Sequence, residues 1–340
     1  MLQCLPMKPD KTGDTNWDIV GHQWAVRLLQ RAVAADSVSH AYLFTGPPSV
    51  GKTSLARALA TALLCQREKE PPCGVCRACC LVASGNHPDL HVVESERTGA
   101  SLKIDQVRDL QHQLALTPVE GRWRVAILRR FEEATTPAAN ALLKTLEEPP
   151  PYAVLVVLAT DADRLLSTIV SRCQQVPLRS LPVALVRQAL IERWRAEPDQ
   201  AELLAHLSGG RLGWAVRTLN DSAALKRRAQ RLDDLDHLLA APTIERFQYA
   251  ERLARAAAAA QETLDLWMGW WRDVLLVAAG TSAPLTNVDR RSKLEDHARR
   301  FGVERSAAVI EALHNVSDRL RGNANTRLTL EVLMLDLPRP

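Results

Sequence analysis

The stretch AYLFTGPPSVGKTSLARALATALL, residues 41–64, decides the fold. Residues 46–53 match G-x-x-x-x-G-K-[ST] in full, with an apolar strand-like run before them and a leucine-striped helical pattern after them. Gly46 and Gly51 let backbone N–H groups turn toward phosphate oxygens, and the helix N-terminus adds a favourable dipole. We expect Lys52 to reach the terminal phosphates of ATP and the Thr53 hydroxyl to bind Mg²⁺. The motif alone does not distinguish a loop that holds ATP or ADP from one that has lost its nucleotide.

Outward from this loop, the first half of the chain alternates strand-like and helical stretches. Such alternation predicts a mostly parallel sheet with helices on both faces. After residue 178 only helical patterning remains. The sequence therefore predicts an α/β domain over 1–178, a small helical domain over 179–220 and a helical domain over 221–340. The expected strands are 41–45, 125–128 and 154–160, and the expected helices include 53–64, 137–146, 163–170, 182–194, 199–207 and 214–219.

Four cysteines follow the first helix of the loop motif. Cys65, Cys73, Cys76 and Cys79 have the spacing C-x7-C-x2-C-x2-C, and four thiolates close a tetrahedral structural site. Zn²⁺ is the expected metal, and an iron–sulfur cluster is the alternative. Cys80 is surplus, because the x2 spacing favours Cys79. We therefore expect a structural zinc module over about residues 65–80.

Composition excludes several classes of protein. Apolar residues make up 46% and charged residues 24% of the 340, which excludes a wholly disordered chain. The net charge of +4 is too small to indicate a nucleic-acid binder by itself. The longest strongly apolar run, residues 153–159, is far shorter than the roughly 20 residues of a membrane span. With no secretory signal visible at the start, we expect a cytoplasmic protein that does not enter the membrane.

Several further motifs occur along the chain in a consistent order. Together with the cysteine insert, they resemble the clamp-loader subunits of bacterial DNA polymerase III, which belong to the AAA+ class. The resemblance implies an α/β P-loop AAA+ domain with an inserted zinc module, a small helical lid domain and an all-α collar domain. It also implies a heteropentameric ring with gamma/tau motor subunits and a delta subunit, which loads the sliding clamp on primed DNA. The motifs are IVGHQ at 19–23, HAYLFTGPPSVGKTSLAR at 40–57, NALLKTLEEP at 140–149 and SRC at 171–173.

The departures from this family pattern concern ATP hydrolysis. An active AAA+ motor ends a strand with Asp-Glu, and counting back from NALLKTLEEP places that pair on Arg129 and Arg130. Two cations oppose Mg²⁺ binding and cannot accept a proton. A shifted register would instead nominate Glu132 and Glu133. The family's first sensor falls on Thr160, which is polar and suitable, whereas the place of the second sensor arginine falls near Gly213.

An intact phosphate loop, a lost acidic pair and a retained SRC arginine imply a subunit that completes a neighbour's ATP site. In this role Arg172 is delivered in trans to the γ-phosphate of a motor subunit's ATP. Taken alone, the same side chain is a cation at a helix C-terminus, worth about 0.3–1 kcal/mol. The alternatives are an active gamma/tau-like ATPase motor of the same assembly and a nucleotide-gated binding module outside replication. The sequence shows no set of carboxylates typical of a polymerase active site. A DNA-directed DNA polymerase activity would therefore belong to the assembly and not to this chain.

Two smaller groups of residues complete the predictions. Trp267, Trp270 and Trp271 lie at i, i+3 and i+4, and we expect them to pack within the C-terminal helices rather than stack on bases. Arg122 and Arg124 are candidates for contact with DNA phosphates inside a ring.

Overall fold

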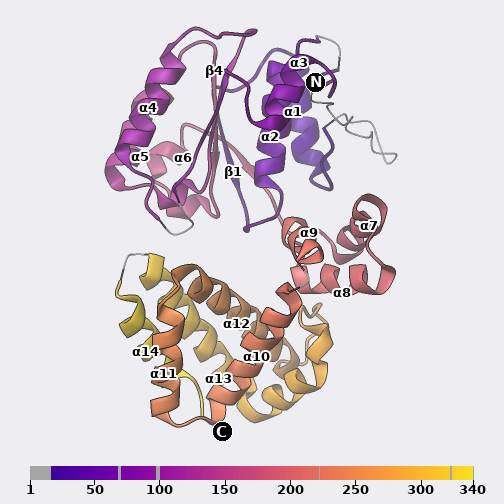
Figure 1. Ribbon diagram of the computed structural model, residues 1–340, viewed down its shortest axis with the longest axis vertical. Helices are drawn as coiled ribbons and strands as arrows, with labels where there is room; N and C mark the ends of the chain where they lie inside the picture. The colour runs from indigo at the N-terminus through magenta and orange to yellow at the C-terminus, as the bar shows by residue number, and fades with distance from the viewer. Residues whose placement is uncertain (1–16, 68–69, 97–99, 222, 322–323, 340) are drawn as a thin grey trace. The chain divides into compact units, whose positions relative to one another are not determined.

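The computed structural model describes residues 17–67, 70–96, 100–221, 223–321 and 324–339. The chain divides into two compact units (Figure 1). The first runs to Leu181 and includes Arg211–Gly213, and the second comprises Pro182–Gly210 and the chain from Trp214 onward. The division of the chain into three domains at residues 178 and 220 stays a prediction.

A five-stranded sheet forms the centre of the first unit. Its strand order is β2-β3-β4-β1-β5, and all neighbouring strands are parallel. The central strand β4 is the sequence AVLVVL with all six residues buried, as expected of a parallel strand covered on both faces. The predicted α/β class with a parallel sheet is therefore confirmed. The strands are β1 (Ala41–Thr45), β2 (Leu90–Val93), β3 (Arg124–Leu128), β4 (Ala153–Leu158) and β5 (Gln174–Pro177).

The two edge strands escape prediction from the sequence. Strand β2 is the four-residue LHVV, and β5 is QQVP with only Val176 buried. Each forms hydrogen bonds with one neighbour in the sheet, so neither needs a long apolar run. Their pairing with β3 and β1, rather than their own composition, makes them strands.

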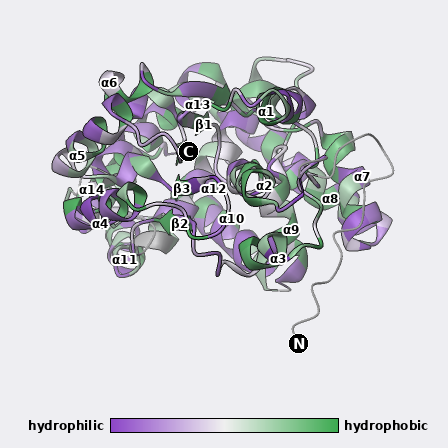
Figure 2. Ribbon diagram, turned by 90° about the horizontal axis from the view of Figure 1, so that it is seen from above, coloured by the Kyte–Doolittle hydropathy of each residue, from purple (hydrophilic) through white to green (hydrophobic). Residues whose placement is uncertain are grey.

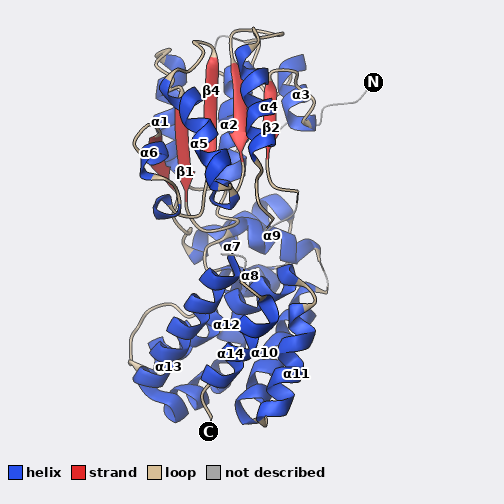
Figure 3. Ribbon diagram, turned by 90° about the vertical axis from the view of Figure 1, so that its left-hand side faces the viewer, coloured by secondary structure: helices blue, strands red, loops and turns tan. Residues whose placement is uncertain are grey.

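Helices cover both faces of the sheet (Figure 3). Alternate residues of β1 point to opposite sides, so Tyr42 and Phe44 pack in one apolar core while Ala41 and Leu43 pack in the other. Helices α1 and α4 each carry both hydrophobic and hydrophilic residues (Figure 2). Their buried residues recur every three or four positions, as on one face of an amphipathic helix. The first core includes α1 (Gln23–Ala34), α2 (Lys52–Leu64) and α3 (Arg77–Ser84), and the second includes α4 (Ile104–Ala115), α5 (Thr136–Glu147) and α6 (Ser167–Val170).

One predicted helix of this unit is partly wrong. The expected helix over 163–170 is a 3₁₀ turn, η2 (Ala162–Arg164), followed by the single turn α6. The interruption lies at Leu165 and Leu166, whose extended backbones have ψ values of 160° and 130°. The helix predicted over 137–146 is confirmed as α5, which begins at the N-cap Thr135 with proline in its first turn.

The second unit is helical throughout its described residues. The three short helices predicted after residue 178 are confirmed to within two residues at each end. All three predicted tryptophans lie in the apolar core of the long C-terminal helices, at most 2% exposed, so the packing prediction is also confirmed. The helices are α7 (Val183–Trp194), α8 (Pro198–Ser208), α9 (Leu212–Asn220), α10 (Ala224–Ala240), α11 (Thr243–Ala254), α12 (Ala257–Ala278), α13 (Arg291–Arg321) and α14 (Thr326–Asp336).

Across the described ranges, no helix combines the length and the apolar character that crossing a bilayer requires.

Candidate functional site

The phosphate loop joins the end of β1 to the start of α2. Gly46 has φ 136° and Gly51 has φ 119°, a region that L side chains rarely adopt. A Cβ at Gly46 would lie 2.1 Å from the carbonyl oxygen of Leu178, so no larger residue fits there without a backbone shift. The Gly46 N–H donates to the carbonyl of Thr160 at 3.1 Å, which ties the loop to the end of β4.

Lys52 begins α2 and folds back over the loop. Its Nζ donates to the carbonyl oxygens of Gly46 and Pro47, the second at 2.9 Å. Burial lowers the pKa of Lys52 to about 8, and the negative charge of Glu132 opposes this shift. Thr53 lies half-buried in the first turn of the same helix. The structure thus places the predicted phosphate and Mg²⁺ residues together at one helix N-terminus.

The N-terminal box reaches the same loop through His22. This side chain is buried, and its Nε2 donates to the carbonyl of Val50 at 3.1 Å. Burial lowers the pKa of His22, and the hydrogen bond to the Val50 carbonyl opposes this shift.

Thr160 and Glu132 lie beside the loop. The backbone N–H of Thr160 donates to Glu132 Oε1 at 3.2 Å. Thr160 Oγ1 and Glu132 Oε2 are both buried, and neither has a hydrogen-bond partner among the described residues. Polar atoms left in this way are costly unless a ligand or water supplies a partner.

The residues in the place of the acidic pair form an ion-pair cluster. Arg129 pairs with Glu94 at 2.9 Å, and Arg130 pairs with Glu94 and Glu133, both at 3.0 Å. Arg130 also donates to Ser95. The structure thus separates the two glutamates of the shifted register. Glu133 neutralises Arg130, whereas Glu132 reaches the phosphate loop.

The position expected for a second sensor arginine packs directly against the loop. The Gly213 N–H donates to the carbonyl of Ser49 at 2.9 Å. A Cβ at this glycine would lie 2.9 Å from the same oxygen, which is closer than side chains approach without a shift. An arginine therefore does not fit at position 213 in this arrangement.

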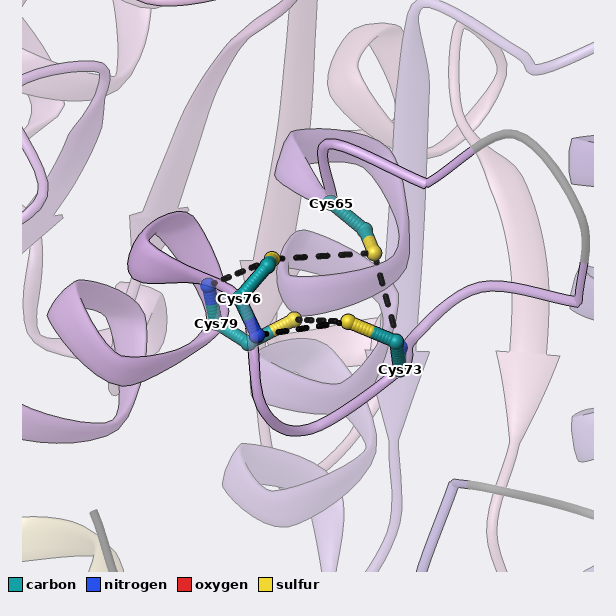
Figure 4. Close-up of side chains that lie close together, drawn as sticks. All are labelled: Cys65, Cys73, Cys76 and Cys79. Carbon is teal, nitrogen blue, oxygen red and sulfur yellow. Dashed lines mark hydrogen bonds between the residues drawn. The ribbon is translucent and has the colours of Figure 1, made fainter.

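The four predicted cysteines come together in a compact cluster (Figure 4). Their sulfur atoms all lie within 4.8 Å of one another. Cys65 follows the end of α2, and Cys76 is the N-cap of α3. Backbone N–H groups donate to the sulfurs of Cys65, Cys73 and Cys76 at 3.4–3.5 Å. The spacing argument for Cys79 over Cys80 agrees with this geometry, because Cys80 is not in the group.

Arg172 lies between α6 and β5. It therefore precedes β5 at the end of the sheet opposite the phosphate loop, which follows the parallel strand β1. Its guanidinium pairs with Glu147 at 2.8 Å and donates to the carbonyl of Thr168 at 3.0 Å, while 36% of the side chain stays exposed. The Thr168 contact is the one expected of a cation at a helix C-terminus. The Glu147 contact joins the SRC motif to the glutamates of NALLKTLEEP. The neighbouring Cys173 is buried, which raises the pKa of its thiol to about 11.

The DNA-contact prediction is wrong for Arg124. Its side chain is 4% exposed and donates to the carbonyls of Gln113 and Thr117, so it is not available to a phosphate. Arg122 is exposed and pairs with Asp36 at 2.8 Å.

Family comparisons cover both units of the chain. A family model described as DNA polymerase III, delta subunit, matches residues 21–182, and one described as its C terminal matches 222–338. The DNA polymerase III subunit delta′ of Bacillus subtilis is 32% identical over 314 residues, which cover 92% of this chain and 94% of that protein. The chain belongs to the family of the DNA polymerase III subunit delta′. This confirms the resemblance to subunits of that polymerase.

Two further relatives refine the placement within the family. The delta′ subunit of Pseudomonas aeruginosa is 39% identical over 64% of this chain and 67% of that protein. The tau subunit of Escherichia coli is 35% identical, but over 61% of this chain and 32% of tau. The similarity to Bacillus delta′ extends along nearly the whole chain, whereas the similarity to tau does not.

Proposed function

We propose that this delta′ family member is a clamp-loader subunit that donates Arg172 in trans to a neighbouring motor subunit's ATP site. In this proposal the chain does not hydrolyse ATP itself. It acts as a stator-like member of a heteropentameric ring with gamma/tau and delta subunits, which loads the sliding clamp on primed DNA. The polymerase activity belongs to the assembly and not to this chain.

The observation that carries the proposal is the surrounding of Arg172. The side chain is partly exposed, and Glu147 and the end of α6 hold it at the surface of the first unit. A guanidinium held in this way can turn its remaining N–H donors toward an anion from a neighbouring chain. An arginine placed against a γ-phosphate accelerates hydrolysis by roughly 10³–10⁵ in GTPase systems.

The chain's own loop supports the second half of the proposal. Arg129 and Arg130 stand where a motor needs its acidic pair, and Glu94 and Glu133 hold both. Gly213 leaves no room for a second sensor arginine. A loop with these replacements keeps the residues that bind phosphates but lacks the acidic pair and the second sensor arginine of a motor. We infer that Gly46, Gly51, Lys52, Thr53 and Thr160 bind ATP or ADP with Mg²⁺ and do not turn it over.

We also propose that Cys65, Cys73, Cys76 and Cys79 hold one structural Zn²⁺. The cluster offers four sulfurs and no open ligand position, which suits a structural rather than a catalytic metal. Metal analysis of fresh protein is expected to give about one zinc per chain, and Cys79→Ser is expected to give less than about half. Cys80→Ser is the matched control and keeps the metal. Iron in place of zinc would support the iron–sulfur alternative.

The domain proposal follows the family pattern. We propose an AAA+ domain over 1–178, a lid over 179–220 and a collar over 221–340, with the assembly in the cytoplasm.

One observation favours the alternative of an active motor. Glu132 lies at the phosphate loop, so the site does not lack a carboxylate. This single group still leaves the loop without an acidic pair, and for this reason we place the motor second.

The test is DNA-stimulated ATP hydrolysis by the complex reconstituted with its gamma/tau and delta partners. Arg172→Ala in this chain is expected to slow turnover at least about tenfold. Arg172→Lys is expected to slow it as well, because lysine lacks the planar fork. Arg108→Ala is the control, since Arg108 is exposed on α4 and its ion pair with Asp105 is long, at 3.8 Å. Normal turnover by an assembled Arg172→Ala complex would falsify the proposal.

A further inference from the structure

Glu132 is a carboxylate that lies beside the phosphate loop and outside positions 129 and 130, where the acidic pair of a motor is expected. It comes from η1 (Phe131–Glu133), the 3₁₀ turn that follows β3. Its Oε1 accepts the Thr160 N–H, and the Thr160 carbonyl accepts the Gly46 N–H. A single residue therefore separates this carboxylate from the first glycine of the loop.

The second oxygen of this carboxylate has no hydrogen-bond partner among the described residues. Glu132 Oε2 is buried and accepts no hydrogen bond from the described residues, and the same holds for the Thr160 hydroxyl. Arg129 and Arg130, which are near in sequence, have their carboxylates in Glu94 and Glu133. A buried carboxylate oxygen of this kind needs a cation or a donor to offset its lost hydration.

The charge of Glu132 reaches the residue that would bind phosphate. It favours the protonated form of Lys52 against the effect of burial. The negative charge of Glu132 attracts the Lys52 ammonium, and it repels a phosphate that is bound to Lys52. Mg²⁺ accepts carboxylate and phosphate oxygens together, so a bound divalent cation would replace this repulsion by attraction to both groups.

We propose that Glu132 makes nucleotide binding at this loop dependent on a divalent cation. The Glu132 carboxylate repels a metal-free nucleoside diphosphate, and its unpaired oxygen favours binding of the Mg²⁺-bound form. This inference rests on the proposed nucleotide binding and is independent of the role of Arg172.

Calorimetric titration with ADP, in Mg²⁺ and separately in EDTA, measures this dependence. The unaltered protein is expected to bind ADP at least about tenfold more tightly in Mg²⁺. Glu132→Gln keeps a carbonyl acceptor for Thr160 and removes the charge. This variant is expected to bind ADP more tightly than the unaltered protein in EDTA and more weakly in Mg²⁺, so that the ratio shrinks to about threefold or less.

Glu133→Gln is the matched control. It removes the same charge one residue away, from a side chain that pairs with Arg130, and is expected to keep the ratio of the unaltered protein. An unchanged ratio in Glu132→Gln overturns the inference and leaves nucleotide binding in place. Equal weakening of that variant in both conditions also overturns it, because this indicates a structural role. Failure of the unaltered protein to bind ADP in either condition overturns the inference and nucleotide binding at the loop together.

Discussion

Two arginines near helix ends, Arg246 on α11 and Arg172 after α6, have opposite surroundings. Arg246 is 1% exposed, and its hydrogen bonds within the described residues all go to backbone carbonyls. Arg172 is partly exposed and contacts one carboxylate and one carbonyl. A guanidinium whose N–H donors all bind fixed backbone carbonyls stabilises the fold. A guanidinium with few partners at the surface can bind a further anion. The carbonyls bound by Arg246 are those of Leu238, Leu239, Met334, Leu337 and Pro338.

The largest expected effect is on stability, and it tests the structural role of Arg246. Arg246→Met leaves several buried carbonyls at the ends of α10 and α14 without donors. We expect the free energy of unfolding to fall by about 3–5 kcal/mol, since each unpaired buried group is costly. Urea unfolding followed by tryptophan fluorescence measures it.

Arg172→Ala is the matched comparison for stability. Its partly exposed ion pair is expected to contribute less than about 1 kcal/mol. Similar losses of unfolding free energy in Arg246→Met and Arg172→Ala would contradict the distinction between a structural arginine and one that is available to a new anion.

A second buried polar group, His297, extends the contrast to pH. The Trp270 indole donates to His297 Nδ1 at 3.1 Å, and His297 Nε2 donates to Asp236 at 3.0 Å, so the neutral ring fits both partners. Burial lowers the pKa of His297, Asp236 opposes this, and the nearby charges of Arg300 and Lys293 lower it further. Because the unfolded pKa is about 6.5, the unfolded chain takes up the proton first as the pH falls.

The stability contributed by His297 is therefore present above about pH 6.5 and is lost below it, by up to about 1.4 kcal/mol per pH unit. Urea unfolding from pH 7.5 to pH 5 measures this loss. His297→Gln keeps an acceptor and a donor but does not titrate, so its stability is expected to fall less steeply. Identical pH dependence of the two proteins would show that His297 takes up its proton equally well when folded.

The smallest expected effect sharpens the functional half of the contrast. Glu147→Gln replaces the ion pair of Arg172 by a weaker hydrogen bond. We expect little change in stability and a roughly threefold slower DNA-stimulated ATP turnover in the reconstituted complex, because the arginine is less well oriented. A rate equal to that of the unaltered complex would mean that Glu147 does not orient Arg172 for the reaction.

The features that could be predicted from the sequence are those encoded within short segments of the chain. The phosphate loop and the cysteine cluster are encoded within short segments, so their geometry follows from spacing. The buried run of β4 is equally plain, because both faces of a central parallel strand are apolar. The helices of the second unit follow from their periodicity.

The rest depends on tertiary contacts that spacing does not reveal. Glu132 reaches the phosphate loop because Arg130 adopts φ 50° and starts a 3₁₀ turn after β3. Arg246 stands in an ordinary amphipathic helix, where an arginine is expected to face solvent. Its burial depends on the ends of α10 and α14, which lie far along the chain. In the same way Gly213 shows its tight fit only once Ser49 is placed against it.

The most direct test compares Arg172→Ala with Lys52→Ala, each in this chain alone, in DNA-stimulated ATP hydrolysis by the reconstituted complex. Arg172 serves the neighbour's ATP in our account, whereas Lys52 serves only this chain's own phosphate loop. We predict that Arg172→Ala slows turnover at least about tenfold and that Lys52→Ala leaves it nearly unchanged. Slow turnover with Lys52→Ala and normal turnover with Arg172→Ala would contradict the account and would show that this chain hydrolyses ATP itself.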